Sequence, residues 1–452
     1  MTRIDIEAFI DKQKVGSHHL VVLLVCGLVC FIDGFDMFMI GKIAPAIADG
    51  FGQPPEAMAN LFVWQQIGLA VGAFGVSPLA DRFGRRNMLM VSCALFGLIT
   101  LASVWAETLT QLTILRTLAG VFMAAGLPMA LAMISEVTPA YRRASFIALS
   151  LVGYSSGNAS SGAVAAWLLD IYGWQSAFWI GGIAPILVIP LLYFFVPESL
   201  KFRAERNPHD STLAKTMRRM DPTLDIPEDA VFVLGEEKDA KARKAKLTDI
   251  FTEGRTLMTC VIWAACLLSM TSIAMTSQWL PTFFQEMAGI PIQEFAVSAL
   301  IGYIGSIAGT LLIGYLMDRF RATRMIPLFY FGLFLAYLGI SWVSFEAGIF
   351  VVLLVAFNFL QTGGQAGLNT LITKVYPPRM RSTALGWAGG AGRVGGVLAP
   401  FYGGYAVAQE FSLQLTLGLA AGVPLAVACL VFVLGRVIRN GKAVLAPDAS
   451  RV

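Results

Sequence analysis

The chain has 452 residues, of which 56% are hydrophobic and only 14% charged, and its mean hydropathy is +0.69. Soluble globular domains carry about 25% charged residues, so these figures exclude an ordinary soluble protein, and the 31 Phe and 9 Trp exclude a disordered one. The net charge of +4 does not indicate nucleic-acid binding, because most basic residues are explained by membrane topology. The six cysteines lie in apolar stretches with no CxxC pair, which favours small buried side chains over disulfides or a zinc site.

Twelve apolar stretches follow one another along the chain, each close to the roughly 20 residues that a helix needs to cross the hydrocarbon core. They cover residues 20–43, 58–80, 88–106, 112–135, 144–169, 175–196, 256–284, 295–317, 325–345, 347–373, 382–408 and 413–434. The sequence therefore predicts an all-α membrane protein with twelve transmembrane helices.

The polar segments between these stretches set the expected organisation. Residues 197–255 hold 12 acidic and 12 basic side chains, which predicts a cytoplasmic linker with short amphipathic helices and too little core for a catalytic domain. The predicted parts are an N-terminus (1–19), a six-helix half (20–196), the linker (197–255), a second six-helix half (256–435) and a tail (436–452).

Basic residues gather on one side of the predicted spans. Of the 33 Lys and Arg, 30 lie in the terminal segments or in alternate loops, and we call this side of the spans the basic end. The opposite loops, at the acidic end, contain no Lys or Arg but hold Asp49, Glu56, Glu107, Asp170, Glu286, Glu294, Glu346 and Glu410. This pattern predicts that both termini are cytoplasmic in a bacterial-type inner membrane. The first apolar run is too long for a signal peptide and lacks a small-residue cleavage site, so the first helix is expected to be retained.

The two halves share short sequence segments. Residues 81–88 resemble residues 318–325 at an offset of 237, and residues 135–145 resemble residues 373–383 at an offset of 238. Two matches at nearly one offset predict a six-plus-six duplication with pseudo-symmetric halves. Such duplications support alternating access by rocking of the halves about a central site.

The chain resembles the major facilitator superfamily over essentially its whole length. Residues 81–86 are similar to the D-R-x-G-R-R part of the loop signature G-x-x-x-D-R-x-G-R-R, and Ser77 stands at the position of its first glycine. In the second copy, Arg321 stands at the position of the second glycine. Residues 33–36 read Asp-Gly-Phe-Asp and residues 392–396 read Gly-Arg-Val-Gly-Gly, which resemble segments of the aromatic acid:proton symporter family. The resemblance implies the major facilitator fold.

Few ionisable groups remain within the spans, and their insertion costs about 2.5–3.5 kcal/mol each, so a function is expected for them. Asp33 and Asp36 are three residues apart and share one helical face, where two carboxylates can exchange protons. Arg116 falls in the same half of the membrane, so an Asp–Arg pair is expected to take part in proton coupling. The alternatives are an Asp that braces a kink at Gly34 and an Arg that only snorkels.

Arg393 lies near the midplane, about 18 Å beyond the basic end, and is the candidate to bind a substrate carboxylate through two hydrogen bonds. The alternative is a partner for one of the two aspartates. Further substrate contacts are expected from Asp36 and from the amide and aromatic side chains of Gln361, Gln365, Asn369 and Trp387, although amides also join helices in membranes. Lys42 is expected to snorkel to the boundary rather than bind.

A charge network is expected at the basic end, where it would close the inner gate, similar to the role of the loop signature in the superfamily. Its predicted members are Asp81, Arg82, Gly84, Arg85, Arg86, Glu136, Arg143, Asp318 and Arg319. The alternative for the arginines is a pure topology signal, which does not explain the acidic residues among them.

Together with these features, the resemblance to the aromatic acid:proton symporter family implies a proton-coupled secondary transporter that imports a small aromatic carboxylate, such as benzoate or a hydroxybenzoate, as a monomer by alternating access. The proton is the expected coupling ion, and no cofactor, metal, enzymatic activity or nucleic-acid partner is expected. One alternative is a carrier of the same fold for a sugar, a dicarboxylate or an exported drug. The other is a membrane receptor that binds without transport.

Overall fold

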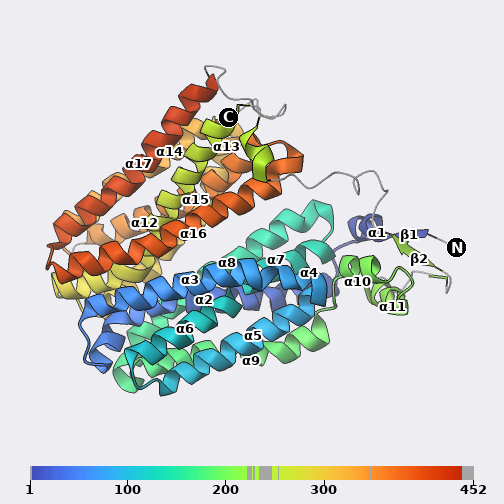
Figure 1. Ribbon diagram of the computed structural model, residues 1–452, viewed down its shortest axis with the longest axis horizontal. Coiled ribbons are helices and arrows are strands. Elements are labelled where there is room, and N and C mark those ends of the chain that lie inside the picture. Colours follow the sequence, from blue (N-terminus) through green and yellow to red (C-terminus); the bar gives the residue numbers. More distant parts are fainter. Residues whose placement is uncertain are drawn as a thin grey trace. The chain divides into compact units, whose positions relative to one another are not determined.

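The computed structural model describes residues 3–220, 226–227, 230–233, 247–252, 254–345 and 348–439 (Figure 1). Long helices dominate these residues. In chain order the elements are β1 (Arg3–Asp5), α1 (Ile6–Lys12), α2 (Ser17–Gly50), η1 (Pro55–Ala57), α3 (Met58–Gly75), η2 (Ser77–Leu79), α4 (Ala80–Phe83), α5 (Arg85–Ala102), η3 (Ser103–Trp105), α6 (Leu109–Met123), α7 (Gly126–Val137), α8 (Ala140–Tyr172), α9 (Gln175–Phe195), α10 (Leu200–Arg206), α11 (Ser211–Met220), β2 (Val231–Val233), η4 (Leu247–Phe251), α12 (Thr256–Ala288), α13 (Ile292–Arg319), α14 (Ala322–Trp342), α15 (Gly348–Val375), α16 (Pro378–Ala408) and α17 (Leu413–Arg439).

The helices account for all of the predicted spans. In the described part of the chain, 10 helices or helix runs are long and apolar enough to cross a membrane. The two remaining spans are α8 and α16, which have 33 and 31 residues and are richer in Gly and Ser. The fourth span is divided into α6 and α7 at Ala124 and Ala125. The prediction of an all-α protein built from membrane-length helices is therefore confirmed.

The internal repeat recurs in the way helices touch. A Cβ added at Gly72 would lie 1.9 Å from the Val121 carbonyl oxygen, so the backbones of α3 and α6 are in contact. The same contact joins α13 to α15, where a Cβ at Gly309 would lie 2.0 Å from the Phe359 carbonyl oxygen. The two pairs are separated by the same offsets, 237 and 238, as the repeated sequence segments. The duplication predicted from sequence therefore extends to backbone packing.

A second pair of contacts relates α2 and α8 to α12 and α16. A Cβ at Gly157 would lie 1.9 Å from the Phe31 carbonyl oxygen, and one at Gly395 would lie 2.1 Å from that of Leu267. Glycine is required at these positions because any side chain would separate the helices. These contacts align α2 with α12 at an offset of 236.

The contacts divide the chain into two compact units, which we describe separately. The first unit holds Met1–Met37, Ile67–Asn158 and Gln175–Ala242, and the second holds Phe38–Gln66, Ala159–Trp174 and Arg243–Val452. Thus the acidic-end segments of α2, α3 and α8 pack with the helices of the second sequence half.

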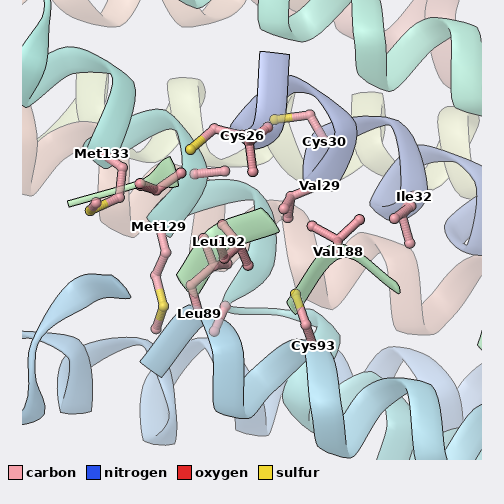
Figure 2. Packing of buried hydrophobic residues seen from close by; sticks show 14 of the residues in the cluster. Cys26, Val29, Cys30, Ile32, Leu89, Cys93, Met129, Met133, Val188 and Leu192 are labelled. Atoms are coloured by element: carbon pink, nitrogen blue, oxygen red, sulfur yellow. The ribbon is translucent and has the colours of Figure 1, made fainter. Parts of the chain in front are cut away.

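The core of the first unit is apolar and closely packed. Figure 2 shows side chains from α2, α5, α7 and α9 that meet in it, among them Cys26, Val29, Cys30, Ile32, Leu89, Cys93, Met129, Met133, Val188 and Leu192. Three cysteines in this group are free and buried, as predicted, whereas Cys260 and Cys429 are free but exposed.

A small module forms where the N-terminal segment meets the linker. Strands β1 and β2 pair in parallel, with Ile4 opposite Phe232, and they lie beside α1, α10 and α11 (Figure 1). This terminal module has its own buried core of Ile6, Phe9, Ile10, Leu200, Ala204, Leu213, Met217, Ile226, Ala230 and Phe232. The predicted linker therefore carries short helices, and part of it folds together with the N-terminus.

Candidate functional site

A buried ion pair links α2 to α6. Arg116 donates to both carboxylate oxygens of Asp36, with 3.1 Å between Nη1 and Oδ1, and both side chains are 0% exposed. The Nη1 of Arg116 also lies 3.4 Å from the Thr100 hydroxyl of α5, and its guanidinium lies 5.6 Å from the Phe178 ring of α9. The Nε atom of Arg116 is buried without a hydrogen-bond partner. Four helices thus converge on one bidentate pair.

Asp33 lies in a different environment from Asp36. Its half-buried side chain adjoins the start of α7, because a Cβ at Gly126 would lie 3.4 Å from Asp33 Oδ1. It lines a small, largely apolar cavity with Val29, Ile32, Ser92, Cys93, Phe96, Phe122, Met123, Gly126 and Pro185, three of which are labelled in Figure 2. The two carboxylates therefore share one stretch of α2 but have different neighbours.

Gly34 explains why this stretch of α2 holds its position. A Cβ at Gly34 would lie 2.0 Å from the Tyr154 carbonyl oxygen, so α2 touches the α8 backbone between the two aspartates. The contact at Gly157 and Phe31 lies one turn away. The Asp-Gly-Phe-Asp segment thus joins α2 to α8 through glycine and directs Asp36 toward α6.

The predicted amide residues of α15 form a polar network with α12. The amide nitrogen of Gln361 donates to the hydroxyls of Ser272, at 3.3 Å, and Thr276, at 3.1 Å. Ser269 donates to Gln365 Oε1 at 2.5 Å. Two buried tyrosines of α14 complete the network, Tyr330 at 2.5 Å from Ser269 Oγ and Tyr337 at 2.9 Å from Ser272 Oγ.

The other predicted substrate residues have separate surroundings. Asn369 is exposed and accepts from Gln365 Nε2 at 3.4 Å. Trp387 is 43% exposed and stacks on Trp263 of α12, with ring centroids 6.1 Å apart. Arg393 is half-buried on α16, between glycines that bring this helix against α12. The structure thus brings the amides together and associates Trp387 with another indole.

The internal repeat relates this network to the aspartates. With the offset of 236 that aligns α2 with α12, Asp33 corresponds to Ser269 and Asp36 to Ser272. Equivalent positions therefore carry carboxylates in one half and hydroxyls in the other. This division did not emerge from sequence reasoning, although the offset between the repeated motifs was a signal for it.

The predicted charge network at the basic end separates into distinct groups. Arg85 forms an ion pair with Glu136, which is 9% exposed, and lies 3.7 Å from the exposed Asp81. Arg82 is exposed and stacks on Phe83. The loop between α3 and α5 is thus joined to the end of α7 through Arg85.

A second group centres on Glu198, which lies after α9 in the segment Pro197-Glu198-Ser199 and was not among the predicted site residues. Its buried carboxylate accepts from the backbone N–H groups of Arg86, at 3.0 Å, and Asn87, at 3.4 Å. Glu198 therefore caps the start of α5. Gly84 is required here, because its φ is +97° and an added Cβ would lie 2.4 Å from Glu198 Oε2.

Arg143 forms its ion pair with Asp11 rather than with Asp81 or Glu136. Its Nη2 lies 3.1 Å from Oδ1 of Asp11 in α1, and its Nε donates to the Thr138 carbonyl oxygen. In the second half, Arg319 is exposed, and the Asp318 side chain lies outside the described part of the structure. Lys374, at the position equivalent to Glu136, donates to the Met317 carbonyl oxygen at 2.7 Å near the end of α13.

Lys42 corrects one prediction. It does not snorkel to the boundary, because its side chain is 5% exposed and its ammonium donates to the Ser161 hydroxyl at 2.7 Å. The ammonium also lies 5.0 Å from the centre of the Tyr303 ring. A residue expected to be peripheral therefore belongs to the interior of the second unit.

Known proteins are similar to the chain over most of its length. The sequence profile of the Major Facilitator Superfamily matches residues 26–400. The chain is 29% identical over 440 residues to a gallate transporter of Pseudomonas putida, covering 97% of this chain and 96% of the relative. It is 30% identical over 402 residues to a 4-hydroxybenzoate transporter of the same species, covering 88% and 89%.

Solved structures show the same fold. A bacterial homolog of the human lysosomal transporter Spinster, in an inward-facing and unoccupied conformation, matches with a TM-score of 0.74 at 16% identity. The match covers 95% of this chain and 99% of that structure.

Proposed function

The chain belongs to the Major Facilitator Superfamily, and on this premise we propose that it is a secondary transporter that carries a small aromatic carboxylate together with one or more protons. The observation that carries the proposal is the fully buried, bidentate Asp36–Arg116 pair with Asp33 within one helical turn. A buried ion pair is costly to form in an apolar bundle and is weak support for stability, which favours a functional role.

The aspartates provide the proton site. A proton that binds Asp36 neutralises the carboxylate with which Arg116 forms its ion pair, and the contact between α2 and α6 weakens as a result. Asp33 provides a second carboxylate on the same helix, beside the break between α6 and α7. Protonation on one side of the membrane and release on the other then couples proton entry to rearrangement of the first half.

The second half provides the substrate site. Arg393 binds the carboxylate through two parallel hydrogen bonds, and Gln361, Gln365 and Asn369 orient ring hydroxyls. Trp387 supplies an aromatic face. The named substrates of the two Pseudomonas putida relatives, gallate and 4-hydroxybenzoate, support this substrate class.

The membrane orientation follows from the basic loops. The basic end faces the cytoplasm of a bacterial-type inner membrane, and import proceeds from the acidic end as a monomer rocks between two states. The Arg85–Glu136 pair and the Glu198 cap close the basic end in one of these states.

Uptake into proteoliposomes tests the function. We expect labelled gallate, 4-hydroxybenzoate or benzoate to accumulate under an inward proton gradient and to stop accumulating when a protonophore collapses the gradient. Asp33→Asn and Asp36→Asn are expected to abolish accumulation, whereas Glu107→Gln, an exposed acidic-end control, is expected to retain it. Normal uphill uptake by both Asn variants would overturn the coupling role, and transport of a sugar or drug instead would overturn the substrate class.

A further inference from the structure

Lys42 is a buried cation that the mechanism above does not use. It lies on α2 eight residues before Gly50, about 12 Å from the acidic end of that helix. Its ammonium is bound by the Ser161 hydroxyl of α8 at 2.7 Å and lies 5.0 Å from the Tyr303 ring of α13. Because a buried ammonium is costly, a function is the expected reason for its position.

Lys42 adjoins a closed contact between helices of the two sequence halves. A Cβ at Gly41 would lie 2.2 Å from the Ser277 carbonyl oxygen, so α2 and α12 touch one residue away from Lys42. At the same end, Trp279 packs edge-on against Phe62 of α3, with ring centroids 5.4 Å apart. We call these contacts the acidic-end gate.

Buried polar atoms without a protein partner lie in and near the gate. In the part of the chain that the structure describes, Gln65 Oε1, Gln278 Oε1, Trp279 Nε1 and Thr282 Oγ1 are buried without a partner. Two of these residues, Gln278 and Trp279, belong to the gate contacts on α12. When the gate opens, Gln278 Oε1 and Trp279 Nε1 become accessible to a hydrogen-bonding ligand.

We propose that Lys42, Ser161 and Tyr303 form an outer subsite that binds the carboxylate and ring of the arriving aromatic acid when the acidic-end gate opens. The inference rests on the proposed function and adds a second cationic contact, separate from Arg393. The ammonium and the hydroxyl bind the two carboxylate oxygens, and the tyrosine ring stacks against the substrate ring. When the gate closes, Ser161 and Tyr303 replace the carboxylate as the partners of Lys42, and the acid is released toward the deeper site.

Kinetics measured from each side of the membrane test this subsite. We expect Lys42→Gln to raise the KM for uptake of 4-hydroxybenzoate from the acidic-end side by about 10-fold or more, since a charge-assisted hydrogen bond is lost. The KM for transport from the basic-end side is expected to remain near that of the unmodified protein. Lys42→Arg retains the charge, and its KM from the acidic-end side is expected to lie between those of the unmodified protein and Lys42→Gln. Lys12→Gln, at an exposed lysine of α1, serves as the control.

A second variant reports on the ring and guards against misfolding. Tyr303→Leu is expected to reduce the preference for benzoate over cyclohexanecarboxylate by several-fold, with an unchanged elution profile in size-exclusion chromatography. The outer subsite alone would be overturned if the unmodified protein transports aromatic acids and Lys42→Gln has the KM of the unmodified protein from both sides of the membrane. An unmodified protein that transports none of the acids would overturn the proposed function and, with it, the subsite.

Discussion

At the scale of single residues, the Asp36–Arg116 pair is a polar contact held inside the first unit. Both members are fully buried, and each would be left as an isolated charge by removal of the other. Removing one partner of a buried pair costs about 3–5 kcal/mol, whereas removing both is often nearly neutral.

Asp36→Asn and Arg116→Gln are therefore each expected to lower the thermal midpoint in detergent, and the double variant is expected to recover much of that loss. The double variant should nevertheless fail to accumulate substrate, because the proton site is gone. Thermal unfolding of the four proteins checks this. Additive losses in the double variant would show that the pair is not energetically coupled.

A substitution of Arg393 can distinguish bidentate binding of the substrate carboxylate from a simple charge interaction. Arg393→Lys keeps the charge but loses the planar fork that binds a carboxylate bidentately. We expect the KM for 4-hydroxybenzoate to rise about 10-fold or more, with the gradient dependence of uptake unchanged. If Arg393 instead neutralises an aspartate, Lys will substitute with little change in KM.

Residue positions were predictable from sequence to different degrees. The pairing partners Asp36 and Arg116 could be inferred from their common depth, and the structure brings them together. Lys42 was assigned wrongly, because depth alone says nothing about the direction in which a helix presents a side chain. Ser161 and Tyr303, which surround its ammonium, come from helices distant in sequence.

At the scale of helices, glycine contacts hold α2 in register with α8. An added Cβ at Gly34 would lie 2.0 Å from the Tyr154 carbonyl oxygen, whereas an added Cβ at Gly27 of the same helix would have no atom within 4 Å. Gly34→Ala is therefore expected to destabilise the protein by about 1–3 kcal/mol through overpacking. Gly27→Ala should leave the thermal midpoint unchanged or slightly higher, because Ala favours helix. Equal midpoints for the two variants would contradict the contact.

Glu198 connects the end of α9 to the start of α5. Its carboxylate accepts two backbone N–H groups at the positive end of α5, and capping interactions contribute about 0.5–2 kcal/mol. Glu198→Gln is expected to lower the thermal midpoint and slow transport, since the loop at the basic end loses its anchor. Glu205→Gln, an exposed residue of α10, is the control. Unchanged transport in both would restrict Glu198 to a structural role.

At the scale of the whole molecule, the internal repeat could be predicted from sequence, whereas the difference between carboxylates and hydroxyls at its equivalent positions was not predicted. Segments 81–88 and 318–325 predicted the duplication, and the contacts at Gly72 and Gly309 extend it to helix packing. The terminal module could not be anticipated, because β1 and β2 pair residues more than 200 positions apart and carry only three residues each. Pairings of such high sequence separation leave no local pattern.

The different chemistry of equivalent positions predicts that the first half carries proton coupling and the second half carries substrate binding. Asp36 in α2 corresponds to Ser272 in α12, and only the first of these two side chains is a carboxylate. Asp36→Asn is therefore expected to retain exchange of labelled for unlabelled acid while losing gradient-driven accumulation. Ser272→Ala, which removes a partner of Gln361, is expected to raise the KM for exchange several-fold and to keep the dependence on the gradient. Exchange and accumulation assays on the two variants check both halves of the prediction. Loss of gradient dependence in Ser272→Ala would mean that the neutral network of the second half also carries the coupling, and that the asymmetry of the repeat has another cause.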